Sequence, residues 1–505
     1  MYAFSTKYIN LSSFLSLKNF TTNYYIKKNR IPWKYQFQNI PKQELRIGVL
    51  IAVSDIVGHK IHKALKVRIY PSEEQKVILN KTFGCCRFVY NRHKEEKDNF
   101  YNENIKDKNL SKKEIQELYK TFKPKTQKEF CDEFEWLREI PAITVTDTIR
   151  KCDNAYNNYF KSHSGKRKGR KVGFPKFKSR KERNQSFSVY MLSKNCLDWE
   201  HRLITIPKFK QVKFRHSEDK KGKWIEWFKD ATPKNITISK NACGEYWCSI
   251  LFEKKQDLEQ NIKLSNSIGL DFSPSSLYID NNNNTAPNYK PYKQINKKKL
   301  TKLQRRLARK QKDSNNREKA RVKLARFEKH ISDSRKDYIE KETLRLVRTY
   351  DVIGIEDLNL QGMMKFSHNA KNYVDTSWYT FTQKLIWKSQ FNNCIVIKSD
   401  RFYPSSKTCN HCGYINKNLT LSDRKWVCPN CGTEIIRDEN AGKNLRDNAI
   451  NLLVDEIKST LGMERTEVMS MEGTEVNLFN GEIYGVSYEV ENQNSDALKE
   501  AFCFS

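Results

Sequence analysis

The amino-acid sequence predicts a multidomain protein in which α+β and α/β regions are combined with a small zinc-binding module. Three observations support this prediction. A helical, charged stretch in the first half is followed by short strands, the second half has buried strands that end in acidic residues, and two Cys-x-x-Cys pairs follow them. The chain has 505 residues, which is enough for roughly two to four domains.

The chain is strongly basic. It contains 93 Lys and Arg against 59 Asp and Glu, a formal net charge of +34. Such an excess repels itself unless an anionic partner neutralises it, and nucleic acid is the usual partner. A membrane surface is the weaker alternative, because no apolar run reaches the roughly 18 residues of a spanning helix. We therefore expect a nucleic-acid-binding protein with no membrane partner and no small-molecule substrate.

The thirteen cysteines do not predict a disulfide scaffold. The chain is large, shows no convincing signal peptide, and spaces four of its cysteines as metal ligands. A reducing, cytoplasmic setting fits these features better. The other cysteines lie mostly among apolar neighbours and are expected to be small buried side chains.

The first half predicts two kinds of structure in succession. Residues 1–64 carry no clear motif and are treated as an N-terminal extension of unknown role. Apolar and basic residues then alternate from Leu65, which predicts a strand, and Ser72 with Gln75 predicts a capping box that opens a helix. Helical sequence continues to about residue 160, with breaks at two prolines. Short strands over 186–254 predict a small β-barrel.

Two segments are intensely basic. Residues 161–183 hold 11 Lys and Arg with three Gly and two Phe, which predicts a loop that follows phosphates and offers aromatic faces to bases. Residues 297–349 hold 20 Lys and Arg against 7 acids and predict a helical hairpin with one basic face. The alternative for both is a charged surface that only faces solvent. The candidate nucleic-acid contacts are Lys166, Arg167, Lys168, Arg170, Lys171, Lys176, Lys178, Arg305, Arg306 and Arg309.

Four cysteines have the spacing of a structural zinc site. Cys409 and Cys412 form one Cys-x-x-Cys pair, Cys428 and Cys431 form another, and 15 residues separate the pairs. Two such knuckles can bring four thiolates to one tetrahedral Zn²⁺, and the glycine after each pair relieves the tight turn. A redox-active pair is the alternative, but two matched knuckles fit one ion better.

Three acids stand at the ends of apolar segments. Asp271 lies near the end of the run Ile268 to Phe272, Glu356 ends the run that begins at Val352, and Asp438 lies where a helical pattern begins. Taken singly, each is more often a cap or turn residue. Carboxylates on neighbouring strand ends and a helix start can, however, converge on one point. Cleavage of a phosphodiester by two Mg²⁺ ions requires such a cluster.

An ordered set of motifs resembles the TnpB (OrfB) family, the RNA-guided nucleases of insertion sequences that were long described as transposases. The related compact type V CRISPR nucleases are similar too. The resemblance covers about residues 65–450. It rests on KVRIYPSEEQ with FGCCRFVYN, GLDFSP at 269–274, GIEDLNL at 354–360, RFYPSSKTCNHCG at 401–413, WVCPNCG at 426–432 and RDENAGKNL at 437–445.

The resemblance implies a domain order. It implies a β-barrel wedge domain at 65–265 with an inserted helical recognition domain at about 73–160, and an RNase H-like (RuvC) nuclease domain. Motifs I and II of that domain fall in 266–400 together with the hairpin, a zinc ribbon follows at 401–436, and motif III occupies 437–454. The remaining residues, 455–505, have a net charge of 3 − 11 = −8 and are expected to form an acidic, disordered tail.

The resemblance also implies an activity. The chain is expected to be a Mg²⁺-dependent endodeoxyribonuclease that binds a guide RNA and cuts target double-stranded DNA as a monomer with its RNA. It is expected to work in the cytoplasm of a bacterium or archaeon, associated with the nucleoid. Asp271, Glu356 and Asp438 match the catalytic, Mg²⁺-binding acids, and the four cysteines match the Zn²⁺ ligands.

Several alternatives remain open at this point. RuvC-like folds also serve in transposases, so the chain could instead bind DNA as a transposase or regulator without guided cleavage. A compact type V CRISPR effector would differ only in its genomic context. Gly442 stands where the family usually has Ala, but this change removes no metal ligand.

Overall fold

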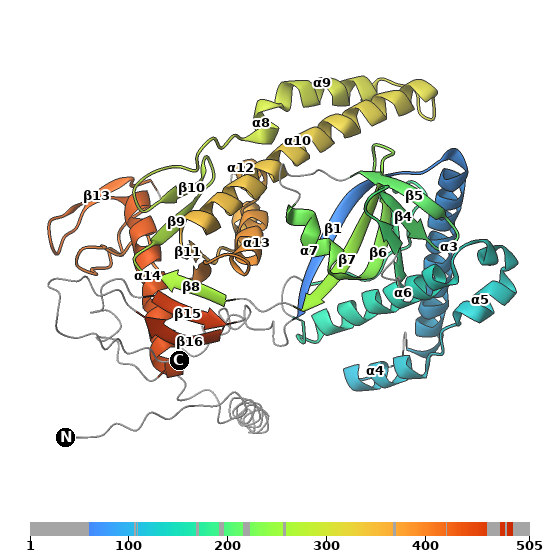
Figure 1. The fold of residues 1–505 in the computed structure, drawn as a ribbon, viewed down its shortest axis with the longest axis horizontal. Helices are drawn as coiled ribbons and strands as arrows, with labels where there is room; N and C mark the ends of the chain where they lie inside the picture. Colours follow the sequence, from blue (N-terminus) through green and yellow to red (C-terminus); the bar gives the residue numbers. More distant parts are fainter. Residues whose placement is uncertain are drawn as a thin grey trace. The chain divides into compact units, whose positions relative to one another are not determined.

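The structure is a computed structural model that describes most of the chain. Its chain contacts define two compact units, which are treated separately: the sheet unit, Ile56–Leu258 with Lys290–Lys341, and the site unit, which includes Glu259–Tyr289 and Glu342–Ser505. Figure 1 shows the elements of both. The described residues are 60–105, 108, 110–167, 171–190, 196–215, 223–255, 259–366, 370–420, 422–461, 475–479 and 482–487.

A seven-stranded antiparallel sheet forms the core of the sheet unit. Its order is β2-β6-β7-β1-β5-β4-β3, and it curls around its buried face (Figure 1). The strands are β1 (Lys60–Tyr70), β2 (Gln185–Tyr190), β3 (Leu197–Asp198), β4 (Leu203–Ile206), β5 (Lys210–Arg215), β6 (Thr232–Lys240) and β7 (Tyr246–Lys255). Buried and less buried residues alternate along β7, as expected for a strand with one face on the core.

Two sequence expectations differ from this sheet. No pairing among the described residues joins the edge strands β2 and β3, so the expected β-barrel is an open half-barrel; β3, with two residues, is too short to close it. The first strand also starts earlier than residue 65, because β1 pairs with β7 from Lys60 onward. Residues 1–59 of the expected extension lie outside the described part.

Helices cover the predicted recognition region. The capping box at Ser72 is confirmed: the Ser72 N–H donates to Gln75 Oε1 at 2.9 Å, and the Gln75 N–H donates to Ser72 Oγ at 3.2 Å. The breaks at Pro124 and Pro141 are confirmed as well, since a proline inside a helix lacks the donor. The elements are α3 (Glu73–Asn104), α4 (Lys112–Thr121), α5 (Gln127–Glu133), the 3-10 helix η3 (Glu135–Glu139), α6 (Ala142–His163) and, beyond β5, α7 (Lys223–Lys229).

The basic hairpin forms as expected, but most of it groups with the sheet unit rather than with region 266–400. The short helix α8 (Tyr292–Ile295) leads into α9 (Lys297–Ala308), and α10 (Asn315–Thr349) returns. Arg317 closes the turn by donating to the Leu307 carbonyl at 3.1 Å. The hairpin meets the β6–β7 turn through Arg321, which donates to the Ala242 carbonyl at 2.8 Å.

A four-stranded sheet positions the acids in the site unit. Its order is β10-β9-β11-β12; β9, β11 and β12 run parallel, and β10 is antiparallel to β9. The strands are β9 (Ser267–Ser273), β10 (Leu277–Asp280), β11 (Val352–Glu356) and β12 (Ile395–Ser399). The helices are α11 (Leu360–Phe366), α12 (Ala370–Thr376), α13 (Trp378–Ser389) and α14 (Arg437–Leu461).

Glycines let α14 lie directly on this sheet. A Cβ on Gly269 would lie 1.9 Å from the Gly442 carbonyl oxygen, and one on Gly354 would lie 2.2 Å from the Leu445 carbonyl oxygen. Both distances are far below ordinary contact, so only glycine fits at these strand positions. Side chains alternate along a strand, and Phe272 on the other face of β9 packs 5.2 Å from Trp378 of α13. The sheet therefore lies between α14 and α13.

The expectation of a disordered tail from residue 455 was wrong for its described residues, 455–461, 475–479 and 482–487. Helix α14 continues to Leu461, and β15 (Glu475–Phe479) and β16 (Glu482–Ser487) form a sheet with β8 (Glu259–Lys263). Val476 and Leu478 join the core formed by α14, β11 and β12. The many acidic residues of this region predicted disorder, so the alternating apolar residues that form the strands were not recognised in the sequence. Residues 462–474 and 488–505 lie outside the described part.

Candidate functional site

The three predicted acids meet at one edge of the four-stranded sheet. Strands β9 and β11 are parallel with Ile355 opposite Leu270, so Asp271 and Glu356 occupy the next position of each strand. Both acids share a face with the glycines two residues earlier, because side chains alternate along a strand. That is the face on which α14 packs, and Asp438 is the second residue of α14. The close approach of the helix therefore brings the third acid to the other two.

The charges at this edge repel one another. Burial raises the pKa of Asp271 well above its usual value, and the carboxylates of Glu356 and Asp438 raise it further. Burial also raises the pKa of Glu356, against the effect of the Ser405 hydroxyl, which donates to Glu356 Oε1 at 2.5 Å. Close acidic groups that share a site in this way are stabilised by a bound cation.

Two arginines that the sequence analysis did not single out hold the third acid. Arg424 Nη1 lies 3.0 Å from Asp438 Oδ2, and Arg437 Nη2 lies 3.0 Å from Asp438 Oδ1. The Arg437 side chain is 12% exposed, whereas that of Arg424 is 68% exposed, so only Arg424 is free to turn toward solvent. Its place between the two cysteine pairs was the one available sequence signal. Arg437 adjoins Asp438 directly.

Neighbouring acids have structural partners instead. Asp357 pairs with Arg401 at 2.6 Å, and Glu439 pairs with Lys443 at 2.7 Å. Asp280 accepts the backbone N–H groups of Asn282 and Asn284 in the turn after β10. Asp271, Glu356 and Asp438 also have partners, but their carboxylates lie close enough to act on one another, so they form the group that could hold divalent ions.

The four cysteines converge as one metal-binding cluster. One ligand atom from each lies within 4.8 Å of the others, the only such cluster in the described residues. Cys409 Sγ lies 3.8 Å from Cys431 Sγ, and Cys412 Sγ lies 3.6 Å from Cys428 Sγ. A tetrahedron with Zn–S bonds of about 2.3 Å has S···S edges of about 3.8 Å, so the geometry fits zinc. The three acids form a wider group than this cluster.

The backbone of both knuckles prepares the cysteines for a metal. Gly413 and Gly432 have φ of +74° and +72°, in the left-handed region that glycine adopts at no steric cost. The hydroxyl and N–H of Thr433 lower the pKa of Cys431 to about 6, which favours the thiolate that zinc requires. The hairpin of β13 (Lys425–Val427) and β14 (Glu434–Ile436) carries the second knuckle.

Asparagines fasten the first knuckle to α14. Asn410 N–H donates to Asn440 Oδ1 at 2.9 Å, and Asn440 Nδ2 donates to the Thr408 carbonyl at 2.7 Å. Asn444 Nδ2 donates to the Ser405 carbonyl at 2.7 Å. The zinc cluster is therefore connected to the first turns of the helix that carries Asp438.

The basic loop is anchored as well as charged. The predicted contacts Lys166, Arg167, Lys171 and Lys176 are exposed, whereas Lys168 and Arg170 lie outside the described residues. Lys178 is partly buried, with its Nζ 4.1 Å from the centre of the Tyr90 ring, and burial lowers its pKa. Phe174 packs edge-on against Tyr156 at 5.4 Å. Phe174, one of the two rings expected to face bases, thus helps to fix the loop to α6. Lys178 fixes the loop to α3 through Tyr90.

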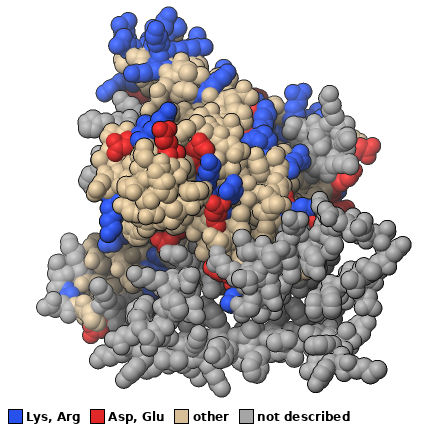
Figure 2. All heavy atoms as spheres, turned by 90° about the vertical axis from the view of Figure 1, so that its left-hand side faces the viewer, with Lys and Arg blue, Asp and Glu red and all other residues tan. Residues whose placement is uncertain are grey.

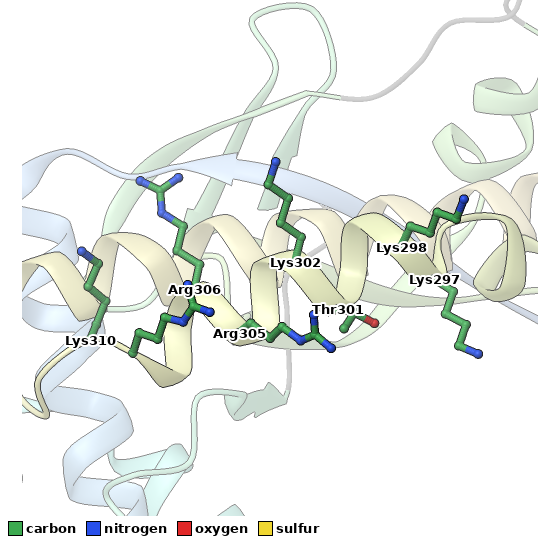
Figure 3. Close-up of a pocket in the computed structure, with 8 residues that line it drawn as sticks. Lys297, Lys298, Thr301, Lys302, Arg305, Arg306 and Lys310 are labelled. Carbon is green, nitrogen blue, oxygen red and sulfur yellow. The ribbon is translucent and has the colours of Figure 1, made fainter.

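Helix α9 carries the densest basic surface. Arg305, Arg306 and Arg309 line an open depression of about 920 Å³ together with Lys297, Lys298, Thr301, Lys302 and Lys310 (Figure 3). Figure 2 shows Lys and Arg crowded at its upper end, the level at which Figure 1 draws α9. Leu300 is buried on the opposite side of the helix. The helix thus has the one packed and one basic face that its sequence predicts.

Three protein-family models match the chain. A model described as a probable transposase (OrfB of IS605) matches residues 249–367, and the Cas12f1-like TNB domain matches residues 378–445. A helix-turn-helix domain of the same OrfB group matches residues 61–106. Here that segment is a strand and a single helix, β1 and α3, not two helices joined by a turn.

Curated relatives agree with these matches. The chain is 29% identical over 389 residues to "Putative RNA-guided DNA endonuclease" of Streptomyces pristinaespiralis, covering 76% of this chain and 89% of the relative. It is 26% identical over 398 residues to "Putative RNA-guided DNA endonuclease InsQ" of Escherichia coli (strain K12), covering 76% and 91%. A solved Cas12f1–sgRNA–target DNA complex gives a TM-score of 0.39 at 14% identity, covering 77% of this chain and 99% of that chain, a similarity too weak to assign a fold.

These matches relate the chain to the OrfB group of insertion sequences. Over 76% of its length the chain is similar to relatives named putative RNA-guided DNA endonucleases, the TnpB (OrfB) family that its motifs resemble. Within the described residues, no helix is both long and apolar enough to cross a membrane.

Proposed function

We propose that this protein is an RNA-guided DNA endonuclease of an insertion sequence that cuts DNA by Mg²⁺-dependent phosphodiester hydrolysis. The observation that carries the proposal is the meeting of Asp271, Glu356 and Asp438 at one edge of the β9–β11 sheet. The names of the relatives support the guided reaction and the DNA substrate. In this proposal the site unit is the RuvC-type nuclease domain, interrupted by a zinc ribbon.

The acids fit a pair of magnesium ions. Mg²⁺ prefers oxygen ligands and usually takes a few carboxylates together with substrate phosphate. Asp271, Glu356 and Asp438 would hold the ions, and their mutual repulsion gives the site its affinity for cations. When bound, two Mg²⁺ ions supply an activated water and neutralise the charge on the departing 3′ oxygen.

The remaining residues orient this group. The Ser405 hydroxyl fixes one oxygen of Glu356, and Arg437 fixes one oxygen of Asp438. Arg424 is 68% exposed, so besides pairing with Asp438 its guanidinium could turn to donate to a phosphate oxygen of the substrate. The zinc cluster would hold Arg424 and the first turns of α14 in fixed positions relative to each other. The proposed role of the Zn²⁺ is therefore structural.

The basic surfaces would hold the nucleic acids. The sheet unit corresponds in this proposal to a wedge domain with an inserted helical recognition domain, and its loop 161–183 and helix α9 bind the guide RNA and its hybrid with DNA. In such proteins base pairing reads the sequence, and the protein reads backbone shape and a short DNA motif. The protein would act as a monomer with its RNA in the cytoplasm, associated with the nucleoid.

The test uses the chain expressed together with the flanking DNA of its own gene, which supplies the guide. Asp271→Ala should abolish cleavage of matched double-stranded DNA in Mg²⁺ but leave RNA binding intact, because the acid lies outside both basic surfaces. Glu439→Ala, which removes an adjacent acid paired with Lys443, is the matched control and should cut normally. Near wild-type cutting by Asp271→Ala would refute the assignment of the site.

A transposase that joins DNA ends is the second candidate, because the family model over residues 249–367 is described as a probable transposase. The same experiment separates the two. Cleavage that needs neither the RNA nor a matched target, together with strand joining, would favour the transposase.

A further inference from the structure

The most exposed large apolar side chain in the described residues lies beside the acidic site. Phe402 is 87% exposed, and it follows the end of β12 at Ser399 by three positions. Strands β9, β11 and β12 are parallel, so their carboxyl ends share one edge. Phe402 therefore stands at the edge where Glu356 ends β11 and where Asp271 lies two residues before the end of β9.

The turn that carries Phe402 is fixed on both sides. The Phe402 N–H donates to Asp400 Oδ1 at 2.9 Å, and Arg401 donates to Asp357 Oδ2 at 2.6 Å. The Tyr403 hydroxyl donates to the Asn444 carbonyl of α14 at 3.3 Å. Two residues later, Ser405 binds Glu356. Because the turn is tied to the acids through these contacts, the ring is held outward at a defined place relative to the site.

The surroundings indicate what the ring could meet. Arg401 and Arg424 are each paired with an acid, but both side chains are more than half exposed, so each guanidinium keeps N–H groups that can donate to a phosphate oxygen. An exposed aromatic ring beside such charges is the usual platform for an unpaired base. A paired base hides its faces in the duplex stack and cannot use the platform.

We propose that Phe402 stacks on an unpaired base of the DNA strand whose phosphate lies at Asp271, Glu356 and Asp438. This inference rests on the proposed nuclease function and adds a positioning residue to it: the Phe402 ring would contact a base of the strand that is cut. The stacked base fixes the register of the strand, and the adjoining phosphate then falls at the acids.

The contact can be detected without any cleavage. The full-length Asp271→Ala chain is mixed with a mixed-sequence single-stranded oligodeoxynucleotide that carries 5-iododeoxyuridine, irradiated, digested and analysed by mass spectrometry. We expect the nucleotide on the peptide that contains Phe402. Cross-links confined to other peptides would overturn the proposal.

Substitutions then measure the effect on the reaction. Phe402→Ala should raise KM for the single-stranded oligonucleotide by roughly fivefold to a hundredfold, the range for loss of one base–aromatic stack. Phe402→Trp should restore it, and Phe402→Leu should restore it only in part. The thermal midpoint should not change, because the side chain is exposed.

Trp387→Ala is the matched control. Trp387 is also an exposed aromatic, 45% exposed, but it lies near the end of α13, which leads into the amino end of β12 at the opposite edge. The KM of the Trp387→Ala variant for the single-stranded oligonucleotide should stay at the wild-type value. If the chain cuts DNA and KM of Phe402→Ala is unchanged, the stacking proposal alone fails. If the chain cuts nothing but the cross-link forms, the nuclease proposal fails and the base contact stands.

Discussion

Alanine at Gly354 should disable the site without touching any acid. A Cβ there would lie 2.2 Å from the Leu445 carbonyl oxygen, whereas ordinary contact begins at 3.4 Å. Helix α14 must therefore retreat by 3.4 − 2.2 = 1.2 Å, and Asp438 lies on the same helix seven residues earlier. A displacement of about 1 Å at a reacting group can lower the rate by roughly a hundredfold. Overpacking also destabilises a core by about 1–3 kcal/mol.

Three glycines at the contact between α14 and the sheet, Gly269 and Gly354 in the strands and Gly442 in the helix, allow a graded test. A Cβ would lie 1.9 Å from the nearest atom at Gly269, 2.2 Å at Gly354 and 2.7 Å at Gly442. The single-turnover cleavage rate and the free energy of unfolding should fall most for Gly269→Ala and least for Gly442→Ala. Guide RNA binding should persist, since the basic loop and α9 belong to the sheet unit.

Gly84→Ala is the control for replacing glycine with alanine at a position where the added Cβ meets no close neighbour. Gly84 lies inside α3, and the nearest atom to an added Cβ is the Arg87 guanidinium at 4.0 Å. Alanine should stabilise the helix by about 0.5–1 kcal/mol and leave cleavage unchanged. The reasoning is refuted if Gly354→Ala cuts at the wild-type rate with unchanged stability, because the close approach would then not position Asp438.

The zinc cluster, the basic surface and the buried acid each allow a further prediction. Cys428→Ser should release the zinc and lower the cleavage rate. Cys243→Ser, which changes a buried cysteine outside the cluster, should keep the zinc. Metal analysis of the two variants tests this difference. Replacing Arg305, Arg306 and Arg309 with Ala should reduce the slope of log affinity for guide RNA against log salt by about 2–3, since each lost phosphate contact removes about 0.7–0.9. A control that removes three charges already paired with acids, Lys76, Lys81 and Arg138, should change it little. Finally, burial and two carboxylates raise the pKa of Asp271 in the folded state, so the folded protein binds more protons than the unfolded one. Stability without Mg²⁺ should therefore fall as pH rises from about 3.9 to the raised pKa, by about 1.4 kcal/mol for each pH unit in that window. Asp271→Asn should reduce that fall in thermal melts but not abolish it, because burial also raises the pKa of Glu356; an identical pH profile would contradict the buried, repelled carboxylate.

Local chemistry explains why much of this protein could be predicted from its sequence. The spacing of two Cys-x-x-Cys pairs leaves little choice but one tetrahedral site, and the four sulfurs meet as that spacing predicts. Ser72 and Gln75 form their capping box because both partners lie within one helical turn. The apolar runs that end at Asp271 and Glu356 form buried strands for a similar local reason.

Long-range packing explains what could not be predicted. The place of Arg424 between the two cysteine pairs puts it near the zinc site but does not show that it pairs with Asp438, because that contact depends on how the zinc hairpin lies against α14. The C-terminal strands were hidden by their acidic charge, and only pairing with β8 and burial of Val476 and Leu478 make them strands.

By itself, then, the sequence determined which side chains could bind metal and where strands and helices begin, because these depend on neighbours within a few residues. The tertiary structure decided that Asp271, Glu356 and Asp438 share one edge. That meeting depends on Gly269 and Gly354, whose missing side chains let α14 approach the sheet. Contact between backbones far apart in the chain is a property of packing, and no local pattern encodes it.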